Sequence, residues 1–403
     1  MSKVMAVILA GGQGKRMDIL CQTRPKPVLP FAGRFRVIDL GLSNCIHSQV
    51  TDIAVLVDYQ RENMTRYLKD WRAANGSNSN LRILPPGVGS YAGTAGAVYQ
   101  NLSYLEKQEG DKVLILAGDH VYKMDYRKMI AFHQMMNADV TVGVVRVPIE
   151  ETHRFGTVMV DAENRIKEFK EKSPTSQSTM ASMGIYIFNK ELLTRRLSED
   201  AREPDSLHDF GYSILPRIVN IDRVFAYEFK GYWHDIGTVE AYYEANMELL
   251  MPQPRFTLDS DWPILNDSSI LPVYRASKEG GIVNSLISPG CVIKGRVENS
   301  VLSPGVHVAE QAIVRNSVLM ADTSIGYHSV VDRCILDERV NLGNYCYAGF
   351  GTGLFPGTPG ITVLGNDVTV PDRTAIGRKC KVVPGLGPAA FVSRLLPSGT
   401  MLL

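Results

Sequence analysis

The sequence predicts an α/β protein, with a Rossmann-like, mostly parallel sheet in its first part and a left-handed parallel β-helix in its second. Two observations favour this fold class. Up to about residue 250, short apolar runs alternate with helical patterns, as in doubly wound sheets. After residue 281, short motifs return at spacings of 15, 17 and 17 residues, which is typical of a coiled solenoid.

Length and composition indicate a globular protein with more than one domain. A chain of 403 residues is long for one hydrophobic core. Its 45% apolar and 21% charged residues are typical of a folded protein. Lys and Arg number 43 against 42 Asp and Glu, so no global charge favours nucleic acid or a membrane as a partner, and phosphate binding must be local.

Two features favour a cytoplasmic protein. The first apolar run is too short to span a membrane and ends in Gly-Gly rather than at a cleavage site, so we expect no export signal. The cysteines are scattered, with no C-x-x-C motif, and we expect them to be buried free thiols in a reducing compartment. They are Cys21, Cys45, Cys291, Cys334, Cys346 and Cys380.

The first element is an uncharged apolar run, Val4 to Ala10, which predicts a buried parallel strand. It leads into Gly11-Gly12-Gln13-Gly14, where the backbone can approach a ligand and turn its N–H groups outward. Lys15, Arg16 and Lys26 follow, and a glycine loop beside cations is how an α/β sheet holds phosphates. The pattern is neither G-x-G-x-x-G, since Met17 replaces the third glycine, nor a P-loop, since Arg16 follows Lys15.

The following elements alternate between strand and helix. We expect further strands at Ile53 to Val57, Val113 to Leu116, Val140 to Val147 and Ile166 to Phe169. One helix is predicted by the spacing of Met64, Tyr67, Leu68 and Trp71, and another by Met129, Ile130 and His133.

The pattern of residues changes near residue 250, where helical periodicity ends and short repeats follow. We expect a domain at 1–250, a linker at 251–281 and a β-helix at 282–403. The motifs N-S-L-I, N-S-V-L, N-S-V-L and R-C-I-L begin at Asn284, Asn299, Asn316 and Arg333. Near the end, Val370, Ile376 and Val382 recur at six-residue steps. One aliphatic residue every sixth position fits a coil of three short strands around an aliphatic core. A β-sandwich with even strand spacing is the alternative.

Two carboxylates are candidate ligands of a metal ion. Asp119 ends the apolar run from Leu114, at the edge of the sheet where ligands bind, with helix capping as the alternative. Asp235 lies among aromatic residues before a glycine turn, as in a ligand pocket. Two carboxylates with nucleotide phosphates are an ordinary arrangement for Mg²⁺.

Three other motifs have competing interpretations. Glu171-Lys172, after a predicted strand, is by itself a solvated charge pair. Gly93-Thr94-Ala95 begins a helix and could cap it or hold an anion. Asp209-Phe210-Gly211 matches the D-F-G of kinases, but no H-R-D-type loop accompanies it, so we discard that interpretation.

Taken together, these motifs resemble those of the nucleotide-sugar pyrophosphorylases, and most closely the bacterial ADP-glucose pyrophosphorylases (glucose-1-phosphate adenylyltransferases). The likeness extends over essentially the whole chain. It is carried by L-A-G-G-Q-G-K-R-M from Leu9, F-R-V-I-D-L-G-L-S-N-C from Phe35, Y-A-G-T-A from Tyr91, A-G-D-H-V-Y-K-M-D-Y from Ala117, P-I-E-E from Pro148, E-K at Glu171, A-S-M-G-I-Y from Ala181, H-D-F-G from His208 and Y-W-H-D-I-G-T from Tyr232.

The resemblance implies a nucleotidyltransferase that converts ATP and glucose 1-phosphate to ADP-glucose and pyrophosphate for glycogen synthesis. It implies that Asp119 and Asp235 hold Mg²⁺, that Arg16 stabilises the leaving phosphates, and that Lys26 acts at the transferred phosphorus. Lys172 would hold the sugar phosphate, and Glu171 would accept hydrogen bonds from sugar hydroxyls. The glucose 1-phosphate site would also include Tyr91, Gly156 and Ser182. The implied nucleotide contacts are Leu9, Ala10, Gly11, Gly12, Gly14, Arg16, Gly93, Thr94 and Asp119.

Several positions depart from the family's usual residues. Pro25 replaces an alanine, Asp58 a glutamine, and His234 the arginine before Asp235, while Ala92 and Gly96 replace an arginine and an aspartate. Thr23 stands where some members place an activator-binding lysine. These departures leave the implied metal ligands and cations in place but leave base choice and allosteric control open.

Three alternatives therefore stay open. The enzyme could transfer guanylyl or thymidylyl groups, or the chain could be a catalytically silent regulatory subunit. An acyltransferase site in the β-helix would need a basic histidine, for which His307 and His328 are the candidates. The family also implies a homotetramer, assembled through the solenoid, and small-molecule allosteric effectors.

Overall fold

A computed structural model describes residues 3–76, 79–87, 89–258, 261–267, 275–276, 281–351 and 360–403. The chain divides into two compact units. The first unit comprises residues 1–12, 38–234 and 261–267, and the second comprises residues 13–37, 235–260 and 268–403. Segment 13–37, which begins within the glycine loop, therefore belongs to the same compact unit as the C-terminal repeats. The predicted domain bounds at residues 250 and 281 stay a prediction.

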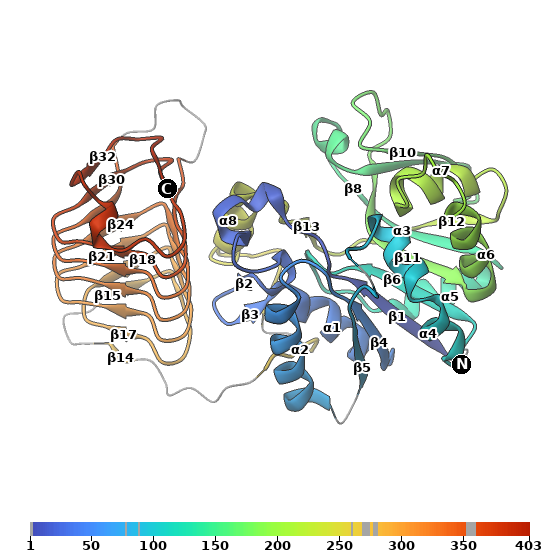
Figure 1. Cartoon of the computed structure of the whole chain (residues 1–403), viewed down its shortest axis with the longest axis horizontal. Helices are drawn as coiled ribbons and strands as arrows, with labels where there is room; N and C mark the ends of the chain where they lie inside the picture. Colours follow the sequence, from blue (N-terminus) through green and yellow to red (C-terminus); the bar gives the residue numbers. More distant parts are fainter. Residues whose placement is uncertain are drawn as a thin grey trace. The chain divides into compact units, whose positions relative to one another are not determined.

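The centre of the first unit is a nine-stranded mixed sheet (Figure 1). One path through it runs in the order β10-β9-β11-β6-β1-β4-β5, and β8 joins β11 to β12. The strands are β1 (Val4–Leu9), β4 (Asp52–Leu56), β5 (Asn80–Leu84), β6 (Lys112–Ala117), β8 (Val140–Arg146), β9 (Gly156–Val160), β10 (Ile166–Glu171), β11 (Met180–Asn189) and β12 (Val224–Glu228). A separate pair joins β7 (His120–Tyr122) to β13 (Trp233–Asp235).

The predicted α/β fold is confirmed, but the sheet is less parallel than expected. Strands β5, β4, β1 and β6 pair in parallel, as does β12 with β8. By contrast, β11 is antiparallel to β6, β8 and β9, and β10 is antiparallel to β9. Only a short 3-10 helix, η4 (Ile149–Arg154), lies between β8 and β9. Parallel neighbours need a long crossover connection, usually a helix, so this part of the chain turns back on itself instead.

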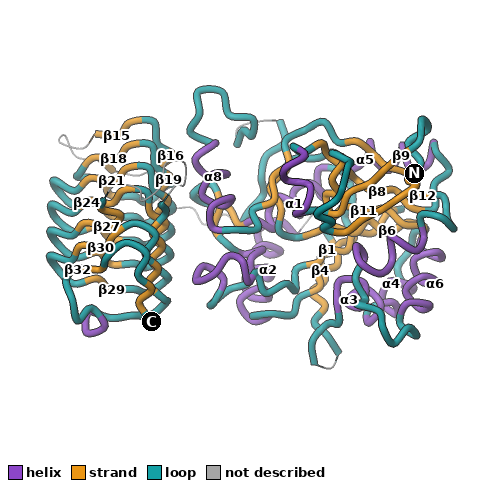
Figure 2. Tube along the Cα trace, turned by 90° about the horizontal axis from the view of Figure 1, so that it is seen from above, coloured by secondary structure: helices purple, strands orange, loops and turns teal. Residues whose placement is uncertain are grey.

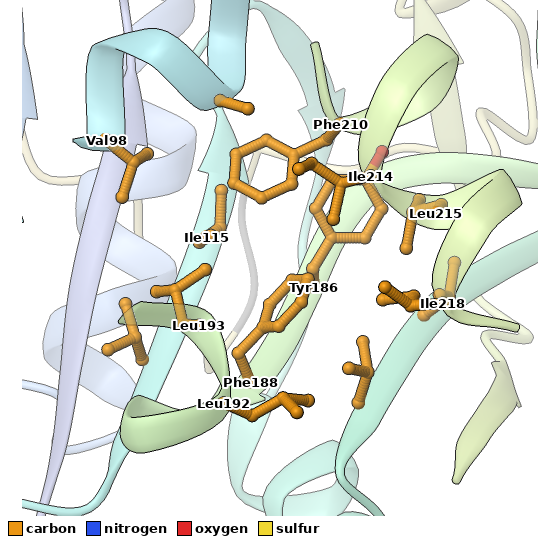
Figure 3. Close-up of a cluster of buried hydrophobic side chains, with 14 of the residues drawn as sticks. Val98, Ile115, Tyr186, Phe188, Leu192, Leu193, Phe210, Ile214, Leu215 and Ile218 are labelled. Carbon is orange, nitrogen blue, oxygen red and sulfur yellow. The ribbon is translucent and has the colours of Figure 1, made fainter. Parts of the chain in front are cut away.

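Both faces of the central strands are buried. Along β1 and β6, Val7 and Ile115 belong to one hydrophobic cluster, and the alternate residues Ile8 and Leu114 are also fully buried, on the opposite face. Figure 3 shows that cluster, with Tyr186 and Phe188 of β11 beside residues of the helices that cover this face. Burial on both faces explains why these strands are continuous apolar runs.

The helices agree with the predicted periodicities. Helix α2 buries Met64, Leu68 and Trp71, and α5 buries Met129 and His133. The helices are α1 (Val37–His47), α2 (Arg61–Asn75), α3 (Gly93–Gln100), α4 (Leu102–Lys107), α5 (Tyr126–Met135), α6 (Lys190–Asp200), α7 (Leu215–Ile218) and α8 (Val239–Glu248). The short helices are η1 (Lys15–Cys21), η2 (Lys26–Val28), η5 (Phe210–Ile214) and η6 (Pro388–Ala390).

The second unit contains a parallel β-helix, whose short strands stack in columns (Figure 2). Three parallel sheets form its sides. The first has β14 (Arg275–Ala276), β17 (Val292–Ile293), β20 (His307–Val308), β23 (Ser324–Ile325), β26 (Asn341–Leu342) and β29 (Thr369–Val370). The second has β15 (Gly281–Val283), β18 (Arg296–Glu298), β21 (Ile313–Arg315), β24 (Val330–Asp332), β27 (Tyr347–Phe350), β30 (Ala375–Gly377) and β32 (Leu395–Leu396). The third has β16 (Leu286–Ile287), β19 (Val301–Leu302), β22 (Val318–Leu319), β25 (Cys334–Leu336), β28 (Thr362–Leu364), β31 (Lys381–Val382) and β33 (Met401–Leu402). A two-stranded sheet of β2 (Pro30–Phe31) and β3 (Phe35–Arg36) lies in the same unit.

The repeats have the predicted core and a repeated corner. Val370, Ile376 and Val382 are buried in one aliphatic cluster. The first residue of each N-S-x-x motif has a left-handed backbone, with φ of 44°, 43° and 48° at Asn284, Asn299 and Asn316. Asparagine adopts this conformation more readily than other non-glycine residues. The sequence repeat thus marks the point where each coil turns into its next strand.

The predicted linker is divided between the units. Residues 251–258 belong to the second unit and 261–267 to the first. In the latter, Trp262 Nε1 donates a hydrogen bond to Asn44 of α1 at 2.9 Å, and Trp71 of α2 donates to the Leu265 carbonyl at 3.3 Å. The remaining linker residues, 259, 260, 268–274 and 277–280, lie outside the described residues.

The expected burial of the cysteines is confirmed. All six cysteines are buried. Within the described part of the chain, no helix has the length and apolar character needed to cross a membrane.

Candidate functional site

The glycine loop begins where β1 ends, and hydrogen bonds hold its first residues to the sheet edge. The Leu9 carbonyl accepts from Gly118 N at 3.0 Å, and Ala10 N donates to the Leu56 carbonyl at 3.0 Å. The Gly11 carbonyl accepts from Tyr59 N at 3.4 Å. A side chain at Gly12 would meet no atom within 4 Å. Hydrogen bonds therefore hold the residues before Gly12 to the sheet, while Gly12 itself faces open space. This arrangement is compatible with the predicted phosphate-binding loop.

Asp58 joins two loops at this edge. Its carboxylate accepts a hydrogen bond from Tyr91 N at 3.0 Å. The Tyr91 hydroxyl donates to the Leu84 carbonyl at 2.8 Å and accepts from Asn101 at 3.2 Å. Burial raises the pKa of Tyr91, so its hydroxyl stays protonated and keeps its donor role. The unusual Asp58 thus orients a predicted sugar-site residue.

Asp119 lies two residues after β6, in the turn at the strand end, with its side chain about 36% exposed. His120 Nε2 is 3.6 Å from its Oδ1. The other ring nitrogen, Nδ1, donates to the Met183 carbonyl at 3.1 Å, and the imidazole packs edge-on against Trp233 with centroids 5.2 Å apart. Asp119 therefore presents a carboxylate at the strand end beside an oriented histidine.

Ser182 lies at an irregularity in β11. The register against β8 shifts between Ser182 and Ile185, and Gly184 has φ of +66°. The Ser182 hydroxyl accepts from Gly184 N at 3.3 Å and lies 3.4 Å from the Tyr186 hydroxyl. Bulges of this kind re-aim side chains beside active sites.

Glu171 lies in a narrow space between two glycines. A Cβ at Gly156 would come within 2.5 Å of Glu171 Oε2, and a Cβ at Gly211 would overlap the same oxygen. Glu171 Oε1 is 3.2 Å from Lys172 Nζ. Burial raises the pKa of Glu171, and the neighbouring Lys172 charge opposes this shift. The pair is thus a confined carboxylate beside a cation, unlike the solvated pair that its sequence alone suggests.

Lys172 is held in an unusual backbone conformation, with φ of +46°. Its backbone N–H donates to the Phe155 carbonyl at 3.0 Å. Its ammonium lies 5.7 Å from the centre of the Tyr212 ring, and the side chain is about half exposed. The cation is therefore accessible to an anionic ligand.

Gly93 and Thr94 begin α3, where Gly93 has φ of +67°. The next two backbone N–H groups, of Ala95 and Gly96, both donate to the His208 carbonyl, at 2.8 and 3.0 Å. The Thr94 hydroxyl donates to Asp209 at 2.8 Å. Part of this helix start therefore binds the 208–209 segment, and the predicted nucleotide contacts of Gly93 and Thr94 stay a prediction.

Asp209 is a residue that the sequence reasoning missed. Besides Thr94, its carboxylate accepts from Gly211 N at 2.8 Å and Tyr212 N at 3.1 Å. It thereby joins the start of α3 to Gly211, which lies against Glu171. The next residue, Phe210, inserts into the core beside Tyr186 and Phe188 (Figure 3). The only sequence signal was the H-D-F-G motif, whose aspartate was set aside together with the kinase interpretation.

The second unit contains the other predicted cations. Gly14 has φ of +62° and precedes the η1 helix. Arg16 in that helix is exposed, and its Nη2 atom lies 2.9 Å from the position that a Cβ of Gly237 would take. Asp235 Oδ2 lies 2.9 Å from that same position. The guanidinium and the carboxylate thus approach one glycine, which leaves room for both.

Lys26 and Asp235 form a buried ion pair in this unit. Lys26 Nζ is 3.4 Å from Asp235 Oδ1, and the side chains are 6% and 9% exposed. Each charge offsets the other in a site that excludes most water. With Arg16 beside Gly237, the structure thus brings together three of the five predicted catalytic residues, Arg16, Lys26 and Asp235.

The predicted metal ligands do not form a closed protein cage. No cluster of three or more His, Cys, Asp or Glu suited to a metal ion occurs among the described residues. Asp119 and Asp235 are hard oxygen donors, one in each unit. Mg²⁺ is commonly held by one or two carboxylates together with substrate phosphates and water, so this donor set is compatible with that ion.

Comparison with known families supports this interpretation. The model of a family described as nucleotidyl transferase matches residues 5–251. A second model, described as the GlmU-like C-terminal hexapeptide, matches residues 272–352.

Curated relatives match over the full length of the chain. A glucose-1-phosphate adenylyltransferase of Acetivibrio thermocellus is 38% identical, covering 100% of this chain and 98% of the relative. The enzymes of the same name from Thermotoga neapolitana and Thermomicrobium roseum are 40% and 41% identical, over 100% and 99% of this chain and 99% and 97% of the relatives.

Proposed function

The chain belongs to the glucose-1-phosphate adenylyltransferase family and is a nucleotidyltransferase, and on this premise we propose that it transfers the adenylyl group of ATP to glucose 1-phosphate, releasing pyrophosphate. The observation that carries this proposal is similarity at about 40% identity over the whole chain to enzymes named for that reaction. The products would be ADP-glucose and pyrophosphate, with ADP-glucose then used for glycogen synthesis.

The reaction requires positioning more than covalent chemistry. A phosphate oxygen of the sugar attacks the α-phosphorus of ATP in line, and the bond from that phosphorus to the bridging oxygen of pyrophosphate breaks. Both substrates are anions, so the protein must bring them together, offset their charge and exclude water.

Two cations would act on the reacting phosphates. Arg16 is exposed in η1 and would stabilise the β- and γ-phosphates that leave. Lys26 is buried beside Asp235 and would stabilise charge at the transferred phosphorus. The confinement of Lys26 favours this role because a buried cation acts in a weakly screened site.

The sugar phosphate would bind at Glu171 and Lys172. The accessible Lys172 ammonium supports a contact with phosphate, and the confined Glu171 carboxylate supports hydrogen bonds from sugar hydroxyls. Tyr91, Gly156 and Ser182 would complete this site. On the nucleotide side we propose contacts from Leu9, Ala10, Gly11, Gly12, Gly14, Gly93 and Thr94.

Asp119 and Asp235 would hold Mg²⁺, which would supply positive charge to offset that of the reacting phosphates. The ion pair with Lys26 is compatible with this assignment because it keeps a carboxylate at residue 235 inside a buried site. His120, beside Asp119, would orient that carboxylate.

Pyrophosphate release tests this proposal. The chain is incubated with Mg²⁺ and glucose 1-phosphate, with ATP, GTP, dTTP, UTP and CTP offered separately, and with D119N as the variant. We expect release with ATP, loss of release on chelation of Mg²⁺, and loss in the variant. Preference for GTP or dTTP would instead support a guanylyl or thymidylyl transferase, with Pro25 and Asp58 as markers of the changed base choice.

If no nucleotide gives pyrophosphate release, even when fructose 1,6-bisphosphate or pyruvate is added, the proposal is contradicted and a silent subunit is favoured. The homotetramer and the allosteric effectors that the family resemblance implies stay predictions, as does the cytoplasmic location expected from the sequence. Gel filtration of the purified chain would test the first of these.

A further inference from the structure

The segment from Asp18 to Gly33, which carries Lys26, lies along one sheet of the β-helix. Asp18 forms an ion pair with Lys381 of β31. Thr23 donates a hydrogen bond to Asn366, two residues after β28, at 2.9 Å. Strands β25, β28 and β31 are neighbours in the third sheet. The segment thus contacts successive coils in order.

The same order continues toward the first coils. Arg24 contacts Asp337, next to β25, and its Nη1 lies 3.8 Å from Met320 Sδ, next to β22. Gly33 lies against Ser288, next to β16, and against Leu302 of β19. A repeated scaffold therefore supports the segment on both sides of Lys26.

The strongest of these links is an ion-pair network at Arg24. Its guanidinium donates to Asp337 Oδ1 at 2.6 Å and to Glu338 Oε2 at 3.2 Å. The Arg24 and Asp337 side chains are only 7% and 0% exposed. A buried ion pair adds little net stability, but separating its partners is costly because either charge left alone would lie away from water.

Arg36 makes a second link through Glu338. Its Nη1 donates to Glu338 Oε1 at 2.8 Å and to the Val28 carbonyl at 3.1 Å. Val28 is the last residue of η2, the single turn that begins at Lys26. Burial alone would raise the pKa of Glu338, but the Arg36 and Arg24 charges outweigh burial and lower it, so this carboxylate stays charged.

Lys26 is thus held from both directions. On one side, Pro25 separates it from Arg24, and Pro27 follows it. Because proline fixes φ, these two residues limit how far Lys26 can move relative to Arg24. On the other side, Arg36 fixes the end of the η2 turn. Lys26 then reaches Asp235 at 3.4 Å.

We propose that Asp337 and Glu338 of the β-helix are positioning residues for group transfer, which act through Arg24 and Arg36 to hold Lys26 in its catalytic position. The inference rests on the proposed function for the role of Lys26. It makes the β-helix part of the catalytic machinery, since its acidic corner after β25 orients a cation of the active site.

The test compares D337N and E338Q with a matched control, D332N, all in the full-length chain. Asp332 is also a buried β-helix carboxylate paired with two arginines, Arg315 at 3.2 Å and Arg378 at 3.3 Å. It lies on β24, in another sheet, and among the described residues none of its side-chain hydrogen bonds or ion pairs reaches segment 13–37. The control therefore reproduces the loss of a buried charge without loosening that segment.

We expect kcat to fall by about ten- to a hundredfold in D337N and E338Q, since small misplacements of catalytic groups have effects of this size. KM for glucose 1-phosphate should change less than about twofold, because the proposed sugar residues are in the first unit. D332N should lower the melting temperature by as much as D337N and leave kcat unchanged.

Hydrogen exchange provides a readout that does not depend on activity. Peptides covering residues 13–31 should exchange faster in D337N and E338Q than in the wild type and D332N, and peptides of β1 and β6 should be unchanged. If exchange and kcat are both unaffected while the melting temperature falls as in D332N, the positioning role is wrong. If D337N does not fold, R24K takes its place, because it keeps the charge opposite Asp337 and loses the link to Glu338.

The two proposals fail in different ways. If the wild type does not release pyrophosphate from any nucleotide, the proposed function is contradicted. Hydrogen exchange in residues 13–31 then still shows whether Asp337 and Glu338 hold the segment. If the wild type is active with ATP, and D337N, E338Q and R24K are as active as the wild type, only the positioning role is contradicted.

Discussion

Lys26 Nζ and Asp235 Oδ1 lie 3.4 Å apart, although 209 residues separate them in the sequence. Both side chains are more than nine-tenths buried. Loss of either partner is costly, because the other charge then stays buried without this counter-charge. The pair thus links catalysis and stability at one point of the second unit.

Replacing Lys26 by methionine should therefore destabilise the protein. K26M keeps the length of the side chain and removes its charge, so Asp235 is left buried without this ammonium. We expect a loss of about 3 kcal/mol, measured by thermal and denaturant unfolding. The double variant K26M/D235N should recover most of this loss and release no pyrophosphate. Equal instability of the single and double variants would contradict a paired role.

Unlike Lys26, Glu171 should lower the stability of the folded protein at neutral pH while contributing to function. Burial raises its pKa above that of the unfolded chain, so ionisation disfavours the folded state. The stabilising effect of the neutral form is present at low pH and is lost as pH rises through the folded pKa. E171Q should consequently melt higher than the wild type at pH 8, and this difference should shrink as pH falls through the raised pKa and vanish below the pKa of the unfolded chain.

The same variant should impair sugar binding. A carboxylate that accepts hydroxyl hydrogen bonds contributes more than a neutral amide, so we expect KM for glucose 1-phosphate to rise about tenfold or more. The matched control is E168Q, on the same strand, where Glu168 is 41% exposed and pairs with Lys170. An unchanged KM in E171Q, or a similar rise in E168Q, would contradict the predicted role.

Two glycines of α3 should respond differently to alanine. A Cβ at Gly93 would overlap the backbone carbonyl oxygens of Leu207 and His208, and its φ of +67° is strained for alanine. A Cβ at Gly96 would meet its nearest atom, His208 Cβ, at an ordinary 3.4 Å. We expect G93A to cost more than about 2 kcal/mol and G96A to be neutral or stabilising by about 0.5–1 kcal/mol. Melting temperatures of the two variants compare these effects, and equal losses would show that the 207–208 segment can move away.

Local patterns in the sequence predicted much of the fold. The apolar run of β1 agrees with the structure within one residue, and the spacing of Met64, Leu68 and Trp71 defined the buried face of α2. The six-residue steps predicted the aliphatic core of the β-helix. These features follow from the period of burial, which the sequence contains directly.

Long-range features were not predictable in the same way. The antiparallel course of β11 depends on how the chain returns after β10, and short strands carry no signal of direction. The links from Arg24 to Asp337 and from Asp209 to Thr94 join residues more than 100 positions apart. A charged residue in a sequence gives its chemistry but not its partner, so the positions of Lys26 and Asp119 were predicted without the contacts that hold them.

The last prediction concerns a departure from the repeat at Arg333. This residue has φ of 52°, in the position that asparagine occupies in the three preceding units. Arginine is less suited than asparagine to the left-handed region, since asparagine bonds locally through its short side chain. We therefore expect R333N to raise the stability of the β-helix by about 0.5–1 kcal/mol. The reciprocal variant N299R should lower stability by a similar amount and also lose the bond from Asn284 Nδ2 at 2.8 Å. Thermal unfolding of both variants tests this. A stability gain in N299R, or a loss in R333N, would mean that side-chain contacts at these corners outweigh the backbone preference.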